Sequence, residues 1–132
     1  MYKRKSINFK FKDVLAKPYH LSETNRITRV YRKLPTGEIS AIICISLDCY
    51  FNRKWRTILY YDTVHGYLHR HERLSLKDMS ETISTQNVKK KGSQNQLMNW
   101  VIRDISRNYI SYKIKFLQNS GCSKSEIVTT IY

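Results

Sequence analysis

The chain has 132 residues, a length typical of one folded domain. Its 24 lysine and arginine residues outnumber ten aspartate and glutamate residues, which gives a formal net charge of +14 at pH 7. The longest apolar run covers only residues 41–45, which argues against a membrane-spanning protein. The three cysteines are odd in number and form no CxxC pair, which argues against a disulfide framework.

The first 27 residues are predicted to form a basic N-terminal strand and a loop. Residues 7–12 alternate apolar and polar side chains, which is the period of a strand with a basic outer face. Residues 13–25 follow no regular period and contain Pro18, so we expect a loop or a short helical turn there.

Residues 28–76 are predicted to form a meandering sheet. The clearest hairpin pairs residues 28–34 with residues 39–47 across a turn at Pro35, Thr36 and Gly37. Residues 48–54 are rich in turn-forming types and are predicted to connect to a third strand at residues 55–61. A fourth strand is predicted at residues 67–76, after a bend at Gly66.

The last third of the chain is predicted to contain a long helix. Residues 77–96 are polar, include three consecutive lysines and read as a mobile basic loop. Apolar side chains recur every four positions from Leu97 to Tyr109 and predict a helix over residues 97–117. Residues 118–132 form a tail whose apolar residues would dock as an edge strand. Strands followed by one helix predict a single α+β domain over residues 1–132, an antiparallel sheet of four to five strands packed on one long C-terminal helix.

Three of the four histidines lie within one short segment, at His65, His69 and His71. Side chains alternate between the two faces of a strand, so His69 and His71 should share one face. His65 would fold back toward them across the Gly66 bend, and Asp62 would reach the same place from the end of the preceding strand. The candidate catalytic residues are His65, His69, His71, Arg70, Arg73, Tyr61 and Asp62.

Three kinds of site fit this cluster. Imidazoles titrate near neutral pH, so two of them would serve as base and acid in RNA cleavage while an arginine stabilises the phosphate. Alternatively, His65, His69 and His71, with Asp62, would hold a zinc ion, although the neighbouring cations oppose this. In the third reading the histidines contact phosphate or make structural hydrogen bonds, and none is catalytic.

The segment at residues 55–71 reads W-R-T-I-L-Y-Y-D-T-V-H-G-Y-L-H-R-H. Its Trp-Arg pair, Tyr-Asp pair and spaced histidines, followed by a C-terminal helix, resemble a group of small prokaryotic proteins. The segment is also loosely similar to the TumE-like toxins of toxin–antitoxin modules, whose middle strands carry a Tyr-Asp pair and then clustered histidines and lysines. The second resemblance implies a growth-inhibiting toxin that acts on RNA and is neutralised by a partner protein.

Basic residues recur along the whole chain. Exposed tyrosines near them would stack on unpaired bases, which is how many proteins hold single strands. Because no recognition-helix, RNP or zinc-finger signature is present, contacts to the phosphate backbone should dominate affinity. The candidate nucleic-acid-binding residues are Lys3, Arg4, Lys5, Lys10, Lys12, Arg29, Arg32, Arg53, Lys54, Arg56, Lys89, Lys90 and Lys91.

The net charge is much larger than solubility requires and favours a polyanionic partner. We therefore expect a small basic protein that binds nucleic acid, RNA in preference to DNA, in a prokaryotic toxin–antitoxin or defence system. One alternative is a metal-independent ribonuclease toxin that uses the three clustered histidines. Another is a non-catalytic subunit of a ribonucleoprotein of the CRISPR type, or an adaptor for an acidic protein.

The expected protein partner is a cognate antitoxin or a larger ribonucleoprotein, and neither a membrane nor a cofactor is expected. The basic start of the chain is not followed by the apolar stretch of a signal peptide, so we expect a cytoplasmic location.

Overall fold

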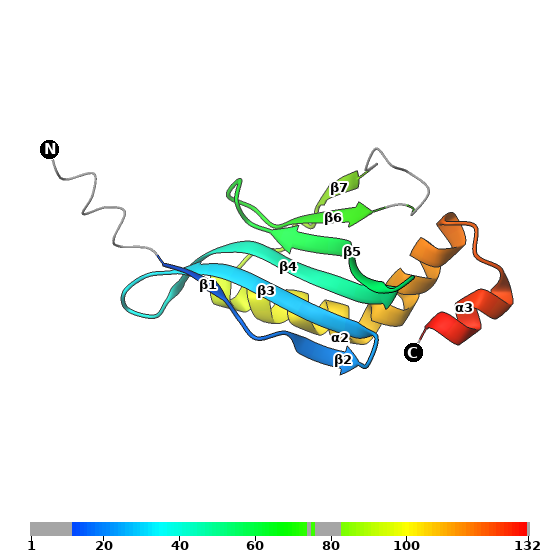
Figure 1. The fold of residues 1–132 in the computed structure, drawn as a ribbon. Helices are drawn as coiled ribbons and strands as arrows, with labels where there is room; N and C mark the ends of the chain where they lie inside the picture. The colour runs from blue at the N-terminus through cyan, green and yellow to red at the C-terminus, as the bar shows by residue number, and fades with distance from the viewer. Residues whose placement is uncertain (1–11, 74, 76–82, 132) are drawn as a thin grey trace, which may run out of the picture.

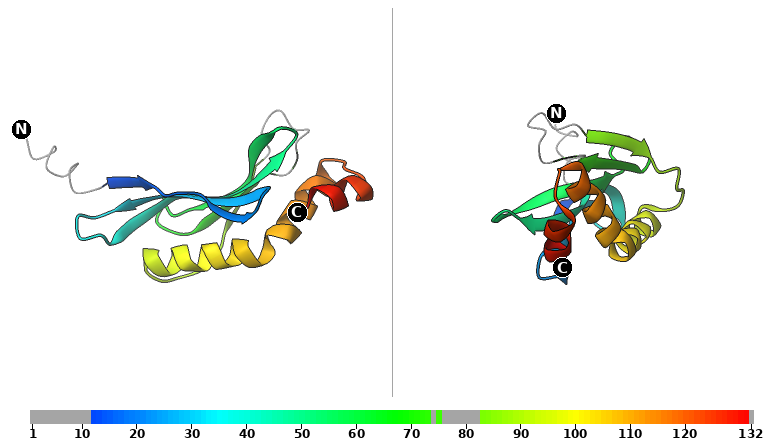
Figure 2. Two further views of the ribbon diagram at one scale, coloured as in Figure 1. Left: turned by 60° about the horizontal axis from the view of Figure 1, so that its bottom comes forward. Right: turned by 90° about the vertical axis from the view of Figure 1, so that its right-hand side faces the viewer.

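An antiparallel sheet and one long helix form the two layers of the protein (Figure 1 and Figure 2). The computed structural model describes residues 12–73, 75 and 83–131. The predicted α+β class is confirmed, and the long helix follows the sheet in the chain as expected. No helix within these described ranges combines the length and apolar character needed to cross a membrane.

Consecutive antiparallel strands build most of the sheet. The strand order is β1-β3-β4-β5-β6-β7, and β2 also pairs with β3, so β3 to β7 form a meander. Both short N-terminal strands lie along the outer edge of β3. The strands are β1 (Lys12–Leu15), β2 (Tyr19–Ser22), β3 (Asn25–Lys33), β4 (Ile39–Phe51), β5 (Lys54–Asp62), β6 (His69–Arg73) and β7 (Ile83–Asn87).

Local turn chemistry explains the two central hairpins. Between β3 and β4 the Gly37 N–H donates to the Leu34 carbonyl at 2.8 Å, and Gly37 has a φ of 90° that few other residues adopt. Between β4 and β5 the turn consists of Asn52 and Arg53, with φ values of 50° and 69°. Two successive residues with positive φ match the twist of the flanking strands, which is why such turns close tight hairpins.

The long helix α2 (Gln94–Asn119) begins at a capping box, in which Ser93 accepts from the Gln96 N–H and the Gln96 side chain accepts from the Ser93 N–H. Its buried stripe packs on the sheet face that carries the apolar side chains of β3, β4 and β5. The core residues on the two layers include Ile27, Ile45, Leu47, Leu59 and Tyr61 on the strands and Leu97, Val101, Ile105 and Phe116 on the helix.

The opposite face of the sheet is polar at its centre. Asp48 on β4 is buried there, and its carboxylate accepts hydrogen bonds from Thr28 at 2.6 Å, Ser46 at 2.9 Å and Thr57 at 2.8 Å. The Arg26 guanidinium lies 3.4 Å from the same carboxylate. No described helix covers this face (Figure 2), which we call the open face. Its polar groups are satisfied across three strands, as buried polar groups must be.

A buried lysine anchors the C-terminal end of the chain. The Lys113 ammonium donates to the backbone carbonyls of Thr130 at 2.6 Å and Ile131 at 3.3 Å, at the end of α3 (Lys124–Thr130). Asn25 on β3 donates to the same Ile131 carbonyl at 3.0 Å. Burial lowers the pKa of Lys113. These contacts hold α3 beside the far end of α2.

Several sequence predictions of the fold need correction. The sheet has seven strands rather than four to five. The loop expected at residues 13–25 contains β1 and β2, the connection expected at 48–54 is mostly the end of β4, and the loop expected at 77–96 contains β7. The tail forms α3 instead of an edge strand. The strand expected at residues 7–12 lies outside the described residues except at Lys12, where β1 begins.

Two of the three cysteines, Cys44 and Cys49, have thiols that resist ionisation. Burial raises the pKa of Cys44 to about 11 and the pKa of Cys49 to about 12. Both thiols therefore stay protonated near neutral pH, and the thiolate is the form that reacts or binds metal.

Candidate functional site

Strand pairing decides which residues of the histidine segment can meet. In the β5–β6 pair, Asp62 lies opposite His69 and Tyr60 lies opposite His71, while Tyr61 lies opposite Arg70. Neighbouring side chains on a strand point to opposite faces, so these pairs alternate between the two sides of the sheet. The seven candidate catalytic residues are thereby divided between the open face and the helix side.

Tyr61 and Arg70 belong to the helix side. The fully buried Tyr61 hydroxyl donates to Asp104 of α2 at 2.5 Å, and Tyr112 donates to the same carboxylate at 2.7 Å. Arg70 donates to the Tyr112 hydroxyl at 3.3 Å. Burial and the Asp104 carboxylate raise the pKa of Tyr61 far above its ordinary value. These contacts join the sheet to the helix and keep both predicted residues away from the histidines.

On the open face, the carboxylate of Asp62 lies between two histidines. His71 Nε2 is 2.8 Å from Asp62 Oδ2, and His71 Nδ1 is 3.0 Å from the Thr85 hydroxyl on β7. The Tyr60 ring stacks on His71 with a centroid distance of 4.5 Å. Both ring nitrogens of His71 therefore have hydrogen-bond partners, which fix the position of its ring.

His69 is held differently from its neighbour. It is 7% exposed, and its Nδ1 is buried 3.8 Å from Asp62 Oδ1 without a hydrogen-bond partner among the described residues. The rings of Tyr67 and His65 lie 4.0 Å and 5.7 Å from the His69 ring by centroid. The exposed His65 does fold back across the Gly66 bend. His69 and His71 thus both lie at Asp62, and His65 reaches the His69 ring.

The zinc alternative has no support in this geometry. Across residues 12–73, 75 and 83–131, no three histidine, cysteine or acidic side chains are arranged to hold a metal ion. His71 already uses both ring nitrogens on Asp62 and Thr85. The carboxylate that would complete the site is shared between two imidazoles.

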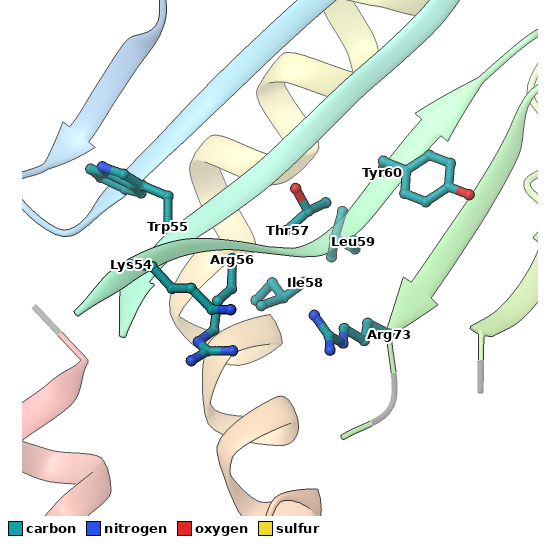
Figure 3. Close-up of a pocket in the computed structure, with 8 residues that line it drawn as sticks. All are labelled: Lys54, Trp55, Arg56, Thr57, Ile58, Leu59, Tyr60 and Arg73. Atoms are coloured by element: carbon teal, nitrogen blue, oxygen red, sulfur yellow. The ribbon is translucent and has the colours of Figure 1, made fainter. Parts of the chain in front are cut away.

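A basic pocket with a volume of about 380 Å³ adjoins this cluster. Figure 3 shows the charged ends of Lys54, Arg56 and Arg73 gathered on one side of β5, while Trp55 and Tyr60 lie on the other side of the strand. Among the described residues, no carboxylate lines the pocket, and none of the ion pairs involves these three cations. The Nε of Arg73 is buried without a hydrogen-bond partner. The pocket therefore presents uncompensated positive charge.

Tyr60 connects the basic pocket with the histidine cluster. Tyr60 lines the pocket and stacks on His71, and Arg73 follows His71 by two residues on β6. Trp55, which also lines the pocket, carries the Arg26 guanidinium over its ring, 4.0 Å from the ring centre. Tyr60 and Trp55 therefore lie on the side of β5 that carries the imidazoles, and the ends of the pocket cations lie on the other side.

The remaining predicted binding residues have different surroundings. Lys3, Arg4, Lys5 and Lys10 lie outside the described residues. Arg32 forms an ion pair with Asp13 at 2.8 Å, and Arg29 donates to the Lys17 carbonyl at 3.4 Å. Exposed positions are held by Lys12 on β1, Arg53 in the β4–β5 turn, and Lys89, Lys90 and Lys91 before α2. Of the predicted set, only Lys54 and Arg56 line the basic pocket.

Sequence reasoning missed three residues of the site, Trp55, Tyr60 and Thr85. Thr85 was part of a predicted loop, so no strand pairing with His71 was expected there. Tyr60 meets His71 only through the β5–β6 register. Trp55 and Tyr60 were visible only as aromatic residues on a predicted strand, where core packing is the more common role.

Comparison with known proteins identifies a family and nothing more specific. The sequence model of a family described as a domain of unknown function, DUF7718, matches residues 12–122. No curated protein and no solved structure matches the chain.

Proposed function

Because the chain belongs to the DUF7718 family, whose function is unknown, we propose a function from the site itself: the protein binds nucleic acid, RNA in preference to DNA, through the basic pocket. The observation that carries this proposal is the composition of the pocket. Three cations, an indole and a phenol line it, and no carboxylate of a described residue does. Phosphate groups are the ligands that such uncompensated cations attract most strongly.

The neighbouring groups favour RNA. Phenol and indole rings stack on unpaired bases, and single-stranded segments are the usual targets of RNA-binding proteins. Asp62, His69 and Thr85, which lie around His71, offer donors and acceptors that a 2′-hydroxyl can use. The long helix packs on the sheet rather than projecting from it, so it is not presented for insertion into a DNA major groove.

The setting that we propose is the prokaryotic cytoplasm, in a toxin–antitoxin or defence system. The similarity of residues 55–71 to TumE-like toxins supports this setting, because those residues form β5 and β6 with the site between them. The protein partner would be a cognate antitoxin or a larger ribonucleoprotein. A basic site masked by an acidic partner is a common way to control nucleic-acid binding.

Binding of a labelled single-stranded RNA, measured by fluorescence anisotropy at several salt concentrations, tests the proposal. If the three pocket cations each neutralise one phosphate, the log–log slope against salt should be about −2. Affinity should then fall about 20-fold between roughly 50 and 200 mM salt. Absence of RNA binding at the lowest salt, or binding that does not respond to salt, would contradict the proposal.

A second candidate function is metal-independent RNA cleavage, and the His65–His69 pair favours it. Their rings are 5.7 Å apart, and the Asp62 carboxylate lies behind His69. One imidazole would take the proton of a 2′-hydroxyl, whose oxygen then attacks the neighbouring phosphorus. The other would protonate the departing 5′-oxygen and leave a 2′,3′-cyclic phosphate.

Cleavage is tested with RNA, the full chain and a metal chelator, with the cyclic phosphate as the product to detect. Replacing His65 or His69 by glutamine should abolish cleavage and leave anisotropy-measured binding within about twofold, because the imidazoles act on protons rather than phosphate charge. If the unaltered protein releases no cyclic phosphate, the protein binds RNA without cleaving it. Cleavage that survives both substitutions also removes this candidate.

A further inference from the structure

A second basic hollow lies along the first turns of α2, at a distance from the pocket beside β5. Two adjoining depressions of about 360 Å³ and 140 Å³ share Trp100 and Arg103 in their walls. We call this surface the α2 groove. Its cations are Lys90 and Lys91 from the segment before the helix, and Arg103 and Arg107 from the helix itself.

Like the basic pocket, the α2 groove carries a net positive charge. None of its four cations takes part in an ion pair between described residues. The one carboxylate in its wall, Asp104, is already used by Tyr61 and Tyr112, and by Asn108 at 3.0 Å. The groove therefore attracts anions, and its described lining has no free carboxylate to repel them.

Trp100 gives this groove a flat aromatic surface. The indole is half-buried and meets the Tyr61 ring edge-on at a centroid distance of 6.3 Å, which fixes its orientation. The Lys90 ammonium lies 5.9 Å from the centre of the indole. That separation is at the outer limit of cation–π attraction. Little attraction is therefore lost when Lys90 moves to a phosphate and a base takes the ring face.

We propose that the α2 groove binds a single-stranded segment of nucleic acid, with an unpaired base stacked on Trp100 and the flanking phosphates on Arg103 and Arg107. This inference rests on the proposed function, because it assigns a second contact to the same polyanionic ligand. The alternation of an aromatic plane with cations is the arrangement by which proteins hold single strands without reading sequence. A duplex has no unpaired base to offer and would bind through its phosphates alone.

The groove and the basic pocket contact the strand at separate places. The pocket reaches α2 near Phe116, since Ile58 and Arg73 line a depression with that residue. Trp100 lies sixteen residues earlier on the helix, which corresponds to about 24 Å along its axis. One extended strand would have to span this length to occupy both sites, and short oligonucleotides would occupy one at a time.

The two tryptophans of the chain allow each site to be observed, because Trp55 lines the pocket and Trp100 lines the groove. In a Trp55→Phe protein the only tryptophan is Trp100, and we expect single-stranded RNA to quench its fluorescence. A duplex of equal length should leave that fluorescence nearly unchanged. Equal quenching by duplex and single strand would overturn the stacking contact.

The affinity of groove variants for single-stranded RNA, measured by fluorescence anisotropy, provides a second test. Trp100→Leu should weaken binding about tenfold, since stacking of one base contributes that order of affinity, while Trp100→Phe should stay within about threefold of the unaltered protein. Arg103→Glu with Arg107→Glu should weaken binding at least tenfold. Lys17→Glu is the control for each single charge reversal, because Lys17 is exposed in the β1–β2 connection and its reversal should change affinity less than about twofold.

The outcomes separate the groove from the proposed function. If RNA binds, and reversal of Arg56 or Arg73 weakens it while the Trp100 and Arg103 variants behave like the Lys17 control, the groove proposal is overturned and the pocket proposal stands. If no variant and no salt concentration reveals RNA binding, both fail together. Circular dichroism and thermal unfolding of each variant exclude loss of fold as the cause.

Discussion

Replacing Arg56 and Arg73 together by glutamate should weaken binding of single-stranded RNA about 100-fold at moderate salt. A hydrogen bond between a cation and a phosphate contributes about 1.5 kcal/mol or more, and tenfold in affinity corresponds to about 1.4 kcal/mol. The two guanidiniums line the same pocket and have no ion-pair partner among the described residues. Each substitution should therefore remove one attractive contact to the RNA phosphates. The salt slope should also fall from about −2 toward zero.

Each single reversal should cost about tenfold, with Lys17→Glu as the control for an equal change of net charge. Arg56 also donates to the Phe51 carbonyl at 3.0 Å, so its glutamate variant loses a structural contact as well. Arg56→Gln keeps a donor for that carbonyl and removes only the charge. If Arg56→Gln and Arg73→Glu bind RNA as tightly as Lys17→Glu, the pocket is not the nucleic-acid site.

Turn chemistry and apolar alternation made the centre of the fold predictable. Pro35, Thr36 and Gly37 identify the β3–β4 hairpin, and the four-residue spacing from Leu97 onward identifies α2. In these elements one face is buried in the core, so burial leaves a periodic pattern in the sequence. The apolar stripe of α2 also predicts that the helix packs on one face of the sheet, as it does.

The edge strands were missed because few of their side chains are buried, so their sequences show no alternation of apolar and polar residues. The exposed Thr85 and Gln86 in β7 leave no apolar alternation, and β2 follows Pro18, which reads as a loop signal. Asp48 explains the error at the end of β4. It is a polar residue inside a strand, and the hydroxyls that satisfy it come from Thr28, Ser46 and Thr57, partners that only the folded sheet brings together.

The candidate site was predictable to the extent that period-two alternation applies. That rule places His69 and His71 on one face, as the structure does, and it also puts Tyr61 on the opposite face from Asp62. Grouping all seven candidates into one site ignored the second consequence. Stacking of Tyr60 on His71 and the bond from His71 to Thr85 depend on strand register, which the sequence pattern does not fix.

Asp104→Ala should produce the largest loss of folding stability among single substitutions near the site, about 3 kcal/mol. The carboxylate accepts from the Tyr61 and Tyr112 hydroxyls at 2.5 Å and 2.7 Å, and its removal leaves the buried Tyr61 hydroxyl without its acceptor. An unsatisfied buried group costs about 1–3 kcal/mol, and hydrogen bonds to a charged acceptor are among the strong ones. The midpoint of thermal unfolding should fall by about 10 °C.

Asn108→Ala is the matched control, because it removes only exposed hydrogen bonds, to the same carboxylate and to the Asp104 backbone carbonyl, both at 3.0 Å. It should lower the free energy of unfolding by less than about 1 kcal/mol. Equal losses for Asp104→Ala and Asn108→Ala in urea denaturation would show that the buried tyrosine does not depend on Asp104.

The pH dependence of stability tests the same contact from the tyrosine side. Burial and the Asp104 carboxylate raise the pKa of Tyr61 above its ordinary value of 10.0. The folded state therefore keeps a proton that the unfolded chain releases, so this stabilisation is complete below pH 10 and is lost as the pH rises beyond it. Between pH 9 and 11 the unaltered protein should lose more stability than Tyr61→Phe, with a limiting difference of about 1.4 kcal/mol per pH unit. Parallel losses in the two proteins would mean that Tyr61 ionises as readily in the folded state as in the unfolded chain, and that the helix and the sheet are not joined through a neutral hydroxyl.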